Sequence, residues 1–253
     1  FYSSSTVGQG TWLNIEPGAI LKFQAGASLN NSGALSALGS EEAPITLTSW
    51  RDDSVGGDSN ADGPSDGQPG DWSQVTYSAD TISFLSNLDH VHIRYPNYGL
   101  DVSSTSISAS NLNIRDTRYY GVYLNTSNAT LDGLTIRDAG RSGIYAYSGA
   151  PSILNSDIQG AEDGIYVQHA TPTLQGNTLQ HNRGWGLYFP YATDTPPISN
   201  NTIITNLRGA RIPASAFPLP DGGNTFIPNT FSPLAILGHT RNTDLPLSVL
   251  RDG

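Results

Sequence analysis

The stretch Gly99–Gly209 repeats one motif, in the order Gly99-Leu100, Gly121-Val122-Tyr123, Gly143-Ile144-Tyr145, Gly164-Ile165-Tyr166, Gly186-Leu187-Tyr188 and Gly209-Ala210-Arg211. The glycines follow one another at spacings of 22, 22, 21, 22 and 23 residues. A second motif keeps the same period upstream of the glycines: Ile93-Arg94, Ile114-Arg115, Ile136-Arg137, Ile158-Gln159 and Leu179-Gln180. A fixed period of this size is typical of a solenoid, in which each unit buries apolar side chains against its neighbours.

The alternation inside each unit indicates short β-strands. In Gly164-Ile165-Tyr166-Val167, Ile165 and Val167 share one face and Tyr166 points to the other. Turn residues separate these segments, and no helical apolar stripe is present. We therefore predict an all-β, right-handed parallel β-helix with about 22 residues per coil. One inner wall should stack Ile93, Ile114, Ile136, Ile158 and Leu179, and another should stack Val122, Ile144, Ile165 and Leu187.

Composition excludes several classes of partner. The 253 residues carry a formal net charge of −10 with a single lysine, Lys22, which argues against binding to nucleic acid, anionic membrane surfaces and polyanionic sugars. No apolar run is long enough to insert into a membrane. The absence of cysteine excludes disulfides and thiolate metal sites.

We expect one domain over residues 1–253. An acidic, glycine-rich insertion at 51–71 interrupts the coils, and the pattern becomes irregular from about residue 217. Asn224–Phe226 and Leu234–Ile236 are the last strands that the sequence predicts.

Two segments resemble a known class of domain. The segment LNIEPGAILKFQAGASLNNSGALSALGSEEAPITLTS, residues 13–49, is similar to the opening of right-handed parallel β-helix domains in large secreted bacterial surface proteins. GDWSQVTYS at 70–78 and LDHVHIRY at 88–95 resemble the part that follows in those domains. The resemblance implies a secreted, extracellular module of the cell surface, for which we expect a structural or adhesive role.

The insertion contains a candidate calcium site. Asp58, Asn60, Asp62 and Asp66 stand at positions 1, 3, 5 and 9 of an EF-hand-like loop, with Gly63 at position 6. Pro69 occupies position 12, where the bidentate glutamate of that loop belongs, so Asp52, Asp53 or Asp71 would have to complete the shell. We expect a structural calcium ion, with a solvated acidic loop as the alternative.

Two outward ladders are candidate surfaces. Tyr123, Tyr145, Tyr166 and Tyr188 should stack about 4.8 Å apart on successive coils. They form either a platform for a surface polysaccharide or a purely structural cover of the sheet. Arg94, Arg115 and Arg137 should form a second ladder, which Asp116 and Asp138 neutralise.

Enzymatic activity is the weaker alternative. Pectate lyases and polygalacturonases share this fold, and a glycoside hydrolase needs two suitably separated carboxylates. The polygalacturonase pattern is absent, and Glu162-Asp163 and Gly238-His239-Thr240 do not rebuild it. The outward ladder positions show no convergent acids, so we predict no catalytic residues and neither lyase nor hydrolase activity.

The ends predict association with further copies. Leu245–Gly253 reads as a strand approaching a turn, and Phe1-Tyr2 through Trp12 reads as its continuation. Exposed terminal coils present unpaired strand edges that a solenoid must cover. We therefore expect tandem modules or head-to-tail subunits that build a stalk or filament.

Overall fold

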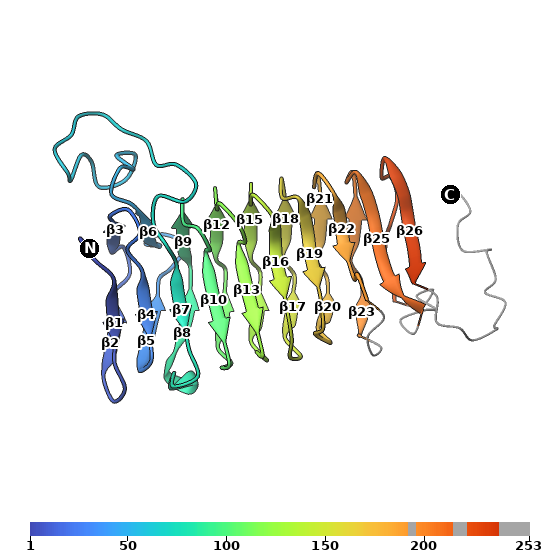
Figure 1. The fold of residues 1–253 in the computed structure, drawn as a ribbon, viewed down its shortest axis with the longest axis horizontal. Helices are drawn as coiled ribbons and strands as arrows, with labels where there is room; N and C mark the ends of the chain where they lie inside the picture. Colours follow the sequence, from blue (N-terminus) through green and yellow to red (C-terminus); the bar gives the residue numbers. More distant parts are fainter. Residues whose placement is uncertain (192–195, 215–221, 238–253) are drawn as a thin grey trace.

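The computed structural model describes residues 1–191, 196–214 and 222–237, and within them the chain is a parallel β-helix. Three sheets run side by side along the long axis (Figure 1). Each of the first eight coils contributes one strand to each sheet, and two further strands extend one of the sheets. One sheet has ten strands and the other two have eight, all parallel to their neighbours. The predicted all-β solenoid is confirmed.

The ten-stranded sheet, called sheet A, consists of β1 (Ser5–Val7), β4 (Leu29–Asn31), β7 (Val75–Tyr77), β10 (Leu100–Ser103), β13 (Val122–Asn125), β16 (Ser142–Ala146), β19 (Asp163–Val167), β22 (Trp185–Tyr188), β25 (Arg208–Pro213) and β26 (Phe231–Leu237). Sheet B consists of β2 (Trp12–Ile15), β5 (Ala34–Leu38), β8 (Asn87–Asp89), β11 (Ser108–Ser110), β14 (Thr130–Asp132), β17 (Ser152–Leu154), β20 (Thr173–Gln175) and β23 (Ile198–Ser199). Sheet C consists of β3 (Ile20–Phe23), β6 (Ile45–Ser49), β9 (Val91–Arg94), β12 (Asn113–Arg115), β15 (Thr135–Arg137), β18 (Asp157–Gln159), β21 (Thr178–Gln180) and β24 (Thr202–Ile204). A short 3-10 helix, Ser83–Leu85, lies between β7 and β8.

The core is a set of like residues stacked in register. Ile93, Ile114, Ile136, Ile158 and Leu179 pair along sheet C, and each is at most 1% exposed. Val122, Ile144, Ile165 and Leu187 pair along sheet A and are equally buried. Both predicted walls are confirmed. Sheet B adds a third wall of Leu88, Ala109, Leu131, Ile153 and Leu174.

The glycine repeat reflects a lack of space where the chain turns from sheet C into sheet A. A Cβ on Gly143 would lie 2.3 Å from Cγ2 of Ile158 and 2.8 Å from the carbonyl oxygen of Gly164. On Gly121 it would lie 2.7 Å from Cγ2 of Ile136. Real Cβ contacts are longer than this, so the repeat needs glycine because the core wall and the next coil approach the backbone.

From the third coil onward, the corner after sheet B and the corner after sheet C each contain a residue with a left-handed backbone. Such residues follow the sheet B strands (His90, Asn111, Gly133, Asn155, Gly176 and Asn200) and the sheet C strands (Tyr95, Asp116, Asp138, Gly160, His181 and Thr205). Glycine, asparagine and aspartate tolerate this conformation best. These corners explain the turn residues that separate the strands in the sequence.

Buried asparagines replace apolar packing in the C-terminal coils. Oδ1 of Asn201 accepts hydrogen bonds from the backbone N–H and Nδ2 of Asn177, both at 2.9 Å, while its Nδ2 donates to the carbonyl oxygen of Leu174 at 2.9 Å. Asn182, Asn206 and Asn229 form an equivalent ladder. Each amide thus satisfies a backbone N–H and a carbonyl oxygen of the preceding coil that would otherwise be buried without partners.

The C-terminal predictions are only partly inside the described residues. Leu234–Ile236 lies within β26, while Asn224–Phe226 contributes a single isolated bridge, between Thr225 and Thr202. The tail Leu245–Gly253 lies outside the described residues. The described part of the chain holds no helix with the length and hydrophobicity needed to span a bilayer.

Candidate functional site

The predicted tyrosine ladder is present on the outer side of sheet A. Tyr123, Tyr145, Tyr166 and Tyr188 pair in register on four successive strands. Their ring centroids are 5.6, 5.0 and 5.1 Å apart in that order. All four side chains are half-buried, since each ring covers part of its neighbours.

The aromatic surface is wider than the sequence predicted. The corner entering sheet A adds further rings, and a second row follows the strand ends through Tyr147, His169 and Tyr191. Nine of the chain's 12 tyrosines belong to one connected network, which we call the tyrosine face: Tyr98, Tyr119, Tyr120, Tyr123, Tyr145, Tyr147, Tyr166, Tyr188 and Tyr191. The sequence contains a pattern that could have predicted part of the tyrosine face, because Tyr98 and Tyr120 each directly precede a repeat glycine.

The stack of rings breaks at Tyr166. Tyr120, Tyr123 and Tyr145 are nearly parallel, with angles of 8–16° between their planes. The Tyr166 ring is tilted by 39° against Tyr145 and by 81° against Tyr188. A hollow of about 390 Å³ opens at this break, lined by Tyr120, Arg141, Ser142, Tyr145, Glu162, Asp163 and Tyr166. We call it the tyrosine hollow.

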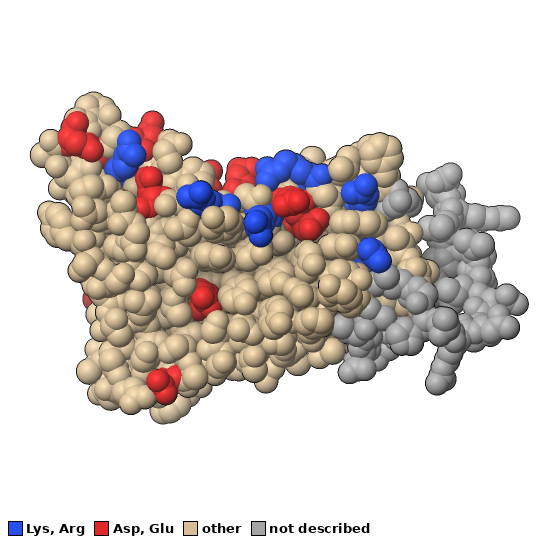
Figure 2. Space-filling model, in the orientation of Figure 1, with Lys and Arg blue, Asp and Glu red and all other residues tan. Residues whose placement is uncertain are grey.

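Charged groups of both signs line the tyrosine hollow. Burial raises the pKa of Asp163, and the nearby Glu162 adds to that effect, although the carboxylate accepts a hydrogen bond from the N–H of Trp185 at 2.7 Å. A hydrogen bond with Tyr120 raises the pKa of Arg141. Figure 2 shows that charged side chains gather along the upper edge of the solenoid in this view and are sparse below it.

We expected no convergent acids at the outward ladder positions, and these two acids line the hollow beside the tyrosine ladder. Glu162 stands in the corner before β19. Asp163 is the first residue of that strand, in register with Ser142 of β16, and neither acid belongs to the tyrosine or the arginine ladder. The hollow therefore combines aromatic rings with hydrogen-bonding groups. Burial, together with nearby phenols, also raises the pKa of Tyr145 to about 12, so its hydroxyl stays protonated at neutral pH.

The arginine ladder lies on the outer side of sheet C, as predicted. Arg94 pairs with Asp52 at 3.6 Å, and Arg115 pairs with Asp116 at 3.8 Å. The prediction that Asp138 neutralises Arg137 was wrong. Arg137 pairs instead with Asp157 of the next coil, at 2.5 Å. Each arginine has its own carboxylate, which favours a structural network.

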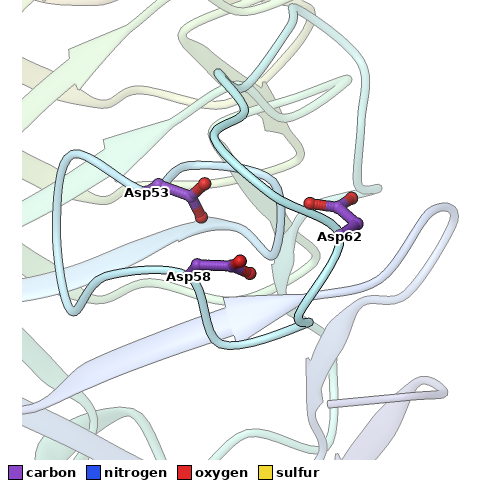
Figure 3. Close-up of side chains that lie close together, drawn as sticks. All are labelled: Asp53, Asp58 and Asp62. Carbon is purple, nitrogen blue, oxygen red and sulfur yellow. The ribbon is translucent and has the colours of Figure 1, made fainter.

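The structure places the predicted calcium ligands as follows. Oxygens of Asp53, Asp58 and Asp62 all lie within 4.8 Å of one another on the insertion loop (Figure 3). Asn60 is next to this group but turns its amide nitrogen to Asp62, at 2.9 Å. Asp66 is exposed and is not part of the group. Asp58 also accepts hydrogen bonds from the N–H groups of Ala61 and Gly63, at 2.7 and 3.1 Å.

Comparison with known proteins agrees with this architecture. The family described as "Right handed beta helix region" matches residues 87–244, which is more than half of the chain. A search of curated proteins and a search of solved structures each found no match. The parallel three-sheet coils and this match together show that the chain belongs to the right-handed β-helix family.

Proposed function

We propose that the chain is a non-enzymatic, adhesive extracellular module that binds a neutral polysaccharide through the tyrosine face. The observation that carries the proposal is the gathering of nine of 12 tyrosines on sheet A and its flanking corners, beside a hollow that three of them line together with charged groups. A sugar ring has an apolar C–H surface and a rim of hydroxyls, which match aromatic rings and flanking hydrogen-bonding groups. The volume of about 390 Å³ is in the usual range for small-ligand sites.

The charge of the protein favours a neutral sugar. The net charge of −10 repels polyanions at long range, and Glu162 and Asp163 repel carboxylate or sulfate groups inside the hollow. Arg141 is the one cation among the residues that line the hollow. Adhesion to a neutral polysaccharide is consistent with this balance.

Hydrolysis is the alternative that the paired acids raise. A glycosidase needs two carboxyl groups on opposite sides of the scissile bond, roughly 5–9.5 Å apart. Glu162 and Asp163 are sequence neighbours that line one hollow together with Arg141. Release of reducing ends from a bound polysaccharide would favour hydrolysis, and binding without release supports the adhesive role.

A glycan array of neutral and acidic polysaccharides tests the proposal. We expect specific binding to neutral glycans, and we expect Tyr166→Ala to weaken it because that ring forms the break in the stack. The matched control is Gln175→Ala, which changes an exposed side chain of sheet B on the same coil. Absence of binding to every glycan, or equal binding by both variants, would contradict the assignment.

Calcium remains a separate prediction for the insertion loop. Asp53, Asp58 and Asp62 supply carboxylate oxygens, which suit this cation, and the site would be structural. Calorimetric titration should give a dissociation constant on the order of 10⁻⁴–10⁻³ M, the range of extracellular modules. Asp58→Ala should abolish the heat, whereas Asp80→Ala, in the connection after β7, should leave it unchanged. No heat at millimolar calcium would reject the site.

We further propose that copies associate end to end. The outer edges of β1, β2 and β3 have no neighbouring strand among the described residues, and the first coil exposes Trp12 (68%), Ile20 (46%) and Phe1 (44%). A further coil, from a second copy, would pair those edges and cover those side chains.

Sedimentation velocity over a range of concentrations tests this association. We expect a concentration-dependent assembly that Trp12→Ser weakens. Phe84→Ser is the matched control, because Phe84 is 79% exposed but lies on the short helix between β7 and β8. A protein that stays monomeric at high concentration would speak against the stalk or filament.

A further inference from the structure

The chain contains neither cysteine nor methionine, the side chains that oxidants usually modify first. Tyrosine and tryptophan are therefore its most readily oxidised residues, and most of its tyrosines are in mutual contact on the tyrosine face. We propose that this face is a site of oxidative cross-linking, in which Tyr145 and Tyr166 couple to form dityrosine between neighbouring coils. The proposal does not depend on sugar binding.

Tyr145 is the hub of the ring network. Its centroid lies 4.8 Å from Tyr120, 5.0 Å from Tyr166, 5.6 Å from Tyr123 and 6.5 Å from Tyr147. A radical formed on any of these rings has a neighbour in contact, so it can pass along the network to Tyr145.

The tilt of the rings selects the pair that couples. In dityrosine the two rings are joined directly and twisted against each other, rather than stacked in parallel. Tyr120 and Tyr123 lie within 9° of parallel to Tyr145, so they must rotate before they can couple. Tyr166 is already tilted by 39° at a centroid distance of 5.0 Å, so this pair needs the smallest rearrangement.

The chemistry requires a one-electron oxidant, such as a haem peroxidase with hydrogen peroxide. Each phenol loses one electron and one proton to give a phenoxyl radical. The two radicals join through ring carbons ortho to the oxygens, and the two ortho hydrogens then move to the oxygens and restore both phenols. Hydrogen peroxide takes up the two electrons and two protons, so two tyrosines and one peroxide give one dityrosine and two waters.

The cross-link would act as a disulfide does in other extracellular domains. Tyr145 and Tyr166 are in register on β16 and β19, so the new bond joins two consecutive coils of sheet A and closes one turn of the solenoid. Closing such a loop lowers the conformational entropy of the unfolded chain and thereby stabilises the folded protein. A cysteine-free chain has no disulfide with which to do this.

Treatment of dilute protein with haem peroxidase and hydrogen peroxide tests the proposal. We expect dityrosine fluorescence in a product that remains monomeric on a denaturing gel. A protease that cuts after acidic residues separates the two tyrosines at Asp157, Glu162 and Asp163. Mass spectrometry should then find the peptides of Tyr145 and Tyr166 joined, with the loss of two hydrogen atoms. Thermal unfolding should show a higher melting temperature for the treated protein.

Two variants and one control decide the outcome. Tyr145→Phe and Tyr166→Phe keep the stacked ring but cannot form a phenoxyl radical, so each should reduce the joined peptides to background. Tyr2→Phe should change nothing inside the monomer, because Tyr2 is 83% exposed and its ring packs at 6.4 Å against Trp50. Cross-links found only between molecules, or mapped to other tyrosines, would overturn the assignment.

Discussion

Ile136→Asp is expected to lower the free energy of unfolding by about 5 kcal/mol, because it combines the loss of a buried aliphatic side chain with an unpaired charge in an apolar stack. Ile136 is fully buried on β15, in register between Ile114 and Ile158. A loss of that size is comparable with the whole stability of many domains. Denaturant titration followed by circular dichroism measures it.

Ile136→Val is the matched control for this substitution. It removes one methylene group and should cost only about 1 kcal/mol. Equal stability of the Asp variant and the wild-type protein would mean that this wall does not face a packed interior.

Gly143→Ala is expected to cost about 2–3 kcal/mol, in the upper part of the usual range for overpacking a tight interior. The added methyl group would lie 2.3 Å from Cγ2 of Ile158 and 2.8 Å from the carbonyl oxygen of Gly164. Both neighbours are part of the closely packed coils, so the corner must open to admit the methyl group. Thermal unfolding compares it with Gly8→Ala, whose Cβ would meet nothing within 4 Å. A Gly143→Ala protein as stable as that control would refute the close-approach explanation of the repeat.

Much of the fold could be predicted from the sequence because a solenoid repeats one set of neighbours. Ile114 and Ile136 occupy the same place in the period, and strand pairing puts them in register. The tyrosine ladder followed from the same argument. Periodicity thus predicts which residues stack, because each coil is a copy of the last.

The site was less predictable because its residues lie where the repeat is irregular. Glu162 stands in the corner before β19 and Asp163 begins that strand, within the one spacing of 21 residues, and the tilt of the Tyr166 ring depends on neighbouring side chains rather than on register. Arg137 pairs with Asp157 because strand pairing brings the next coil next to Arg137, whereas Asp138 stands at the corner with a left-handed backbone.

The acidic group of the insertion loop differs from the EF-hand-like set of ligands that the sequence predicts. Asp53 accepts a hydrogen bond from the N–H of Ser65 at 2.8 Å, which holds the start of the loop against its end. That contact places Asp53 beside Asp58 and Asp62, while Asp66 is exposed and lies outside this group. The sequence named Asp52, Asp53 and Asp71 as alternatives for completing the shell, and the folded loop brings Asp53 to Asp58 and Asp62.

The most direct test of the account is calorimetric titration of a neutral oligosaccharide that the glycan array identifies. The wild-type protein and Gln175→Ala should bind it equally, and Tyr166→Ala should bind at least about tenfold more weakly, a loss of about 1.4 kcal/mol. Circular dichroism should show that both variants remain folded. Unchanged affinity in a folded Tyr166→Ala protein would contradict the claim that the tyrosine face is the binding surface.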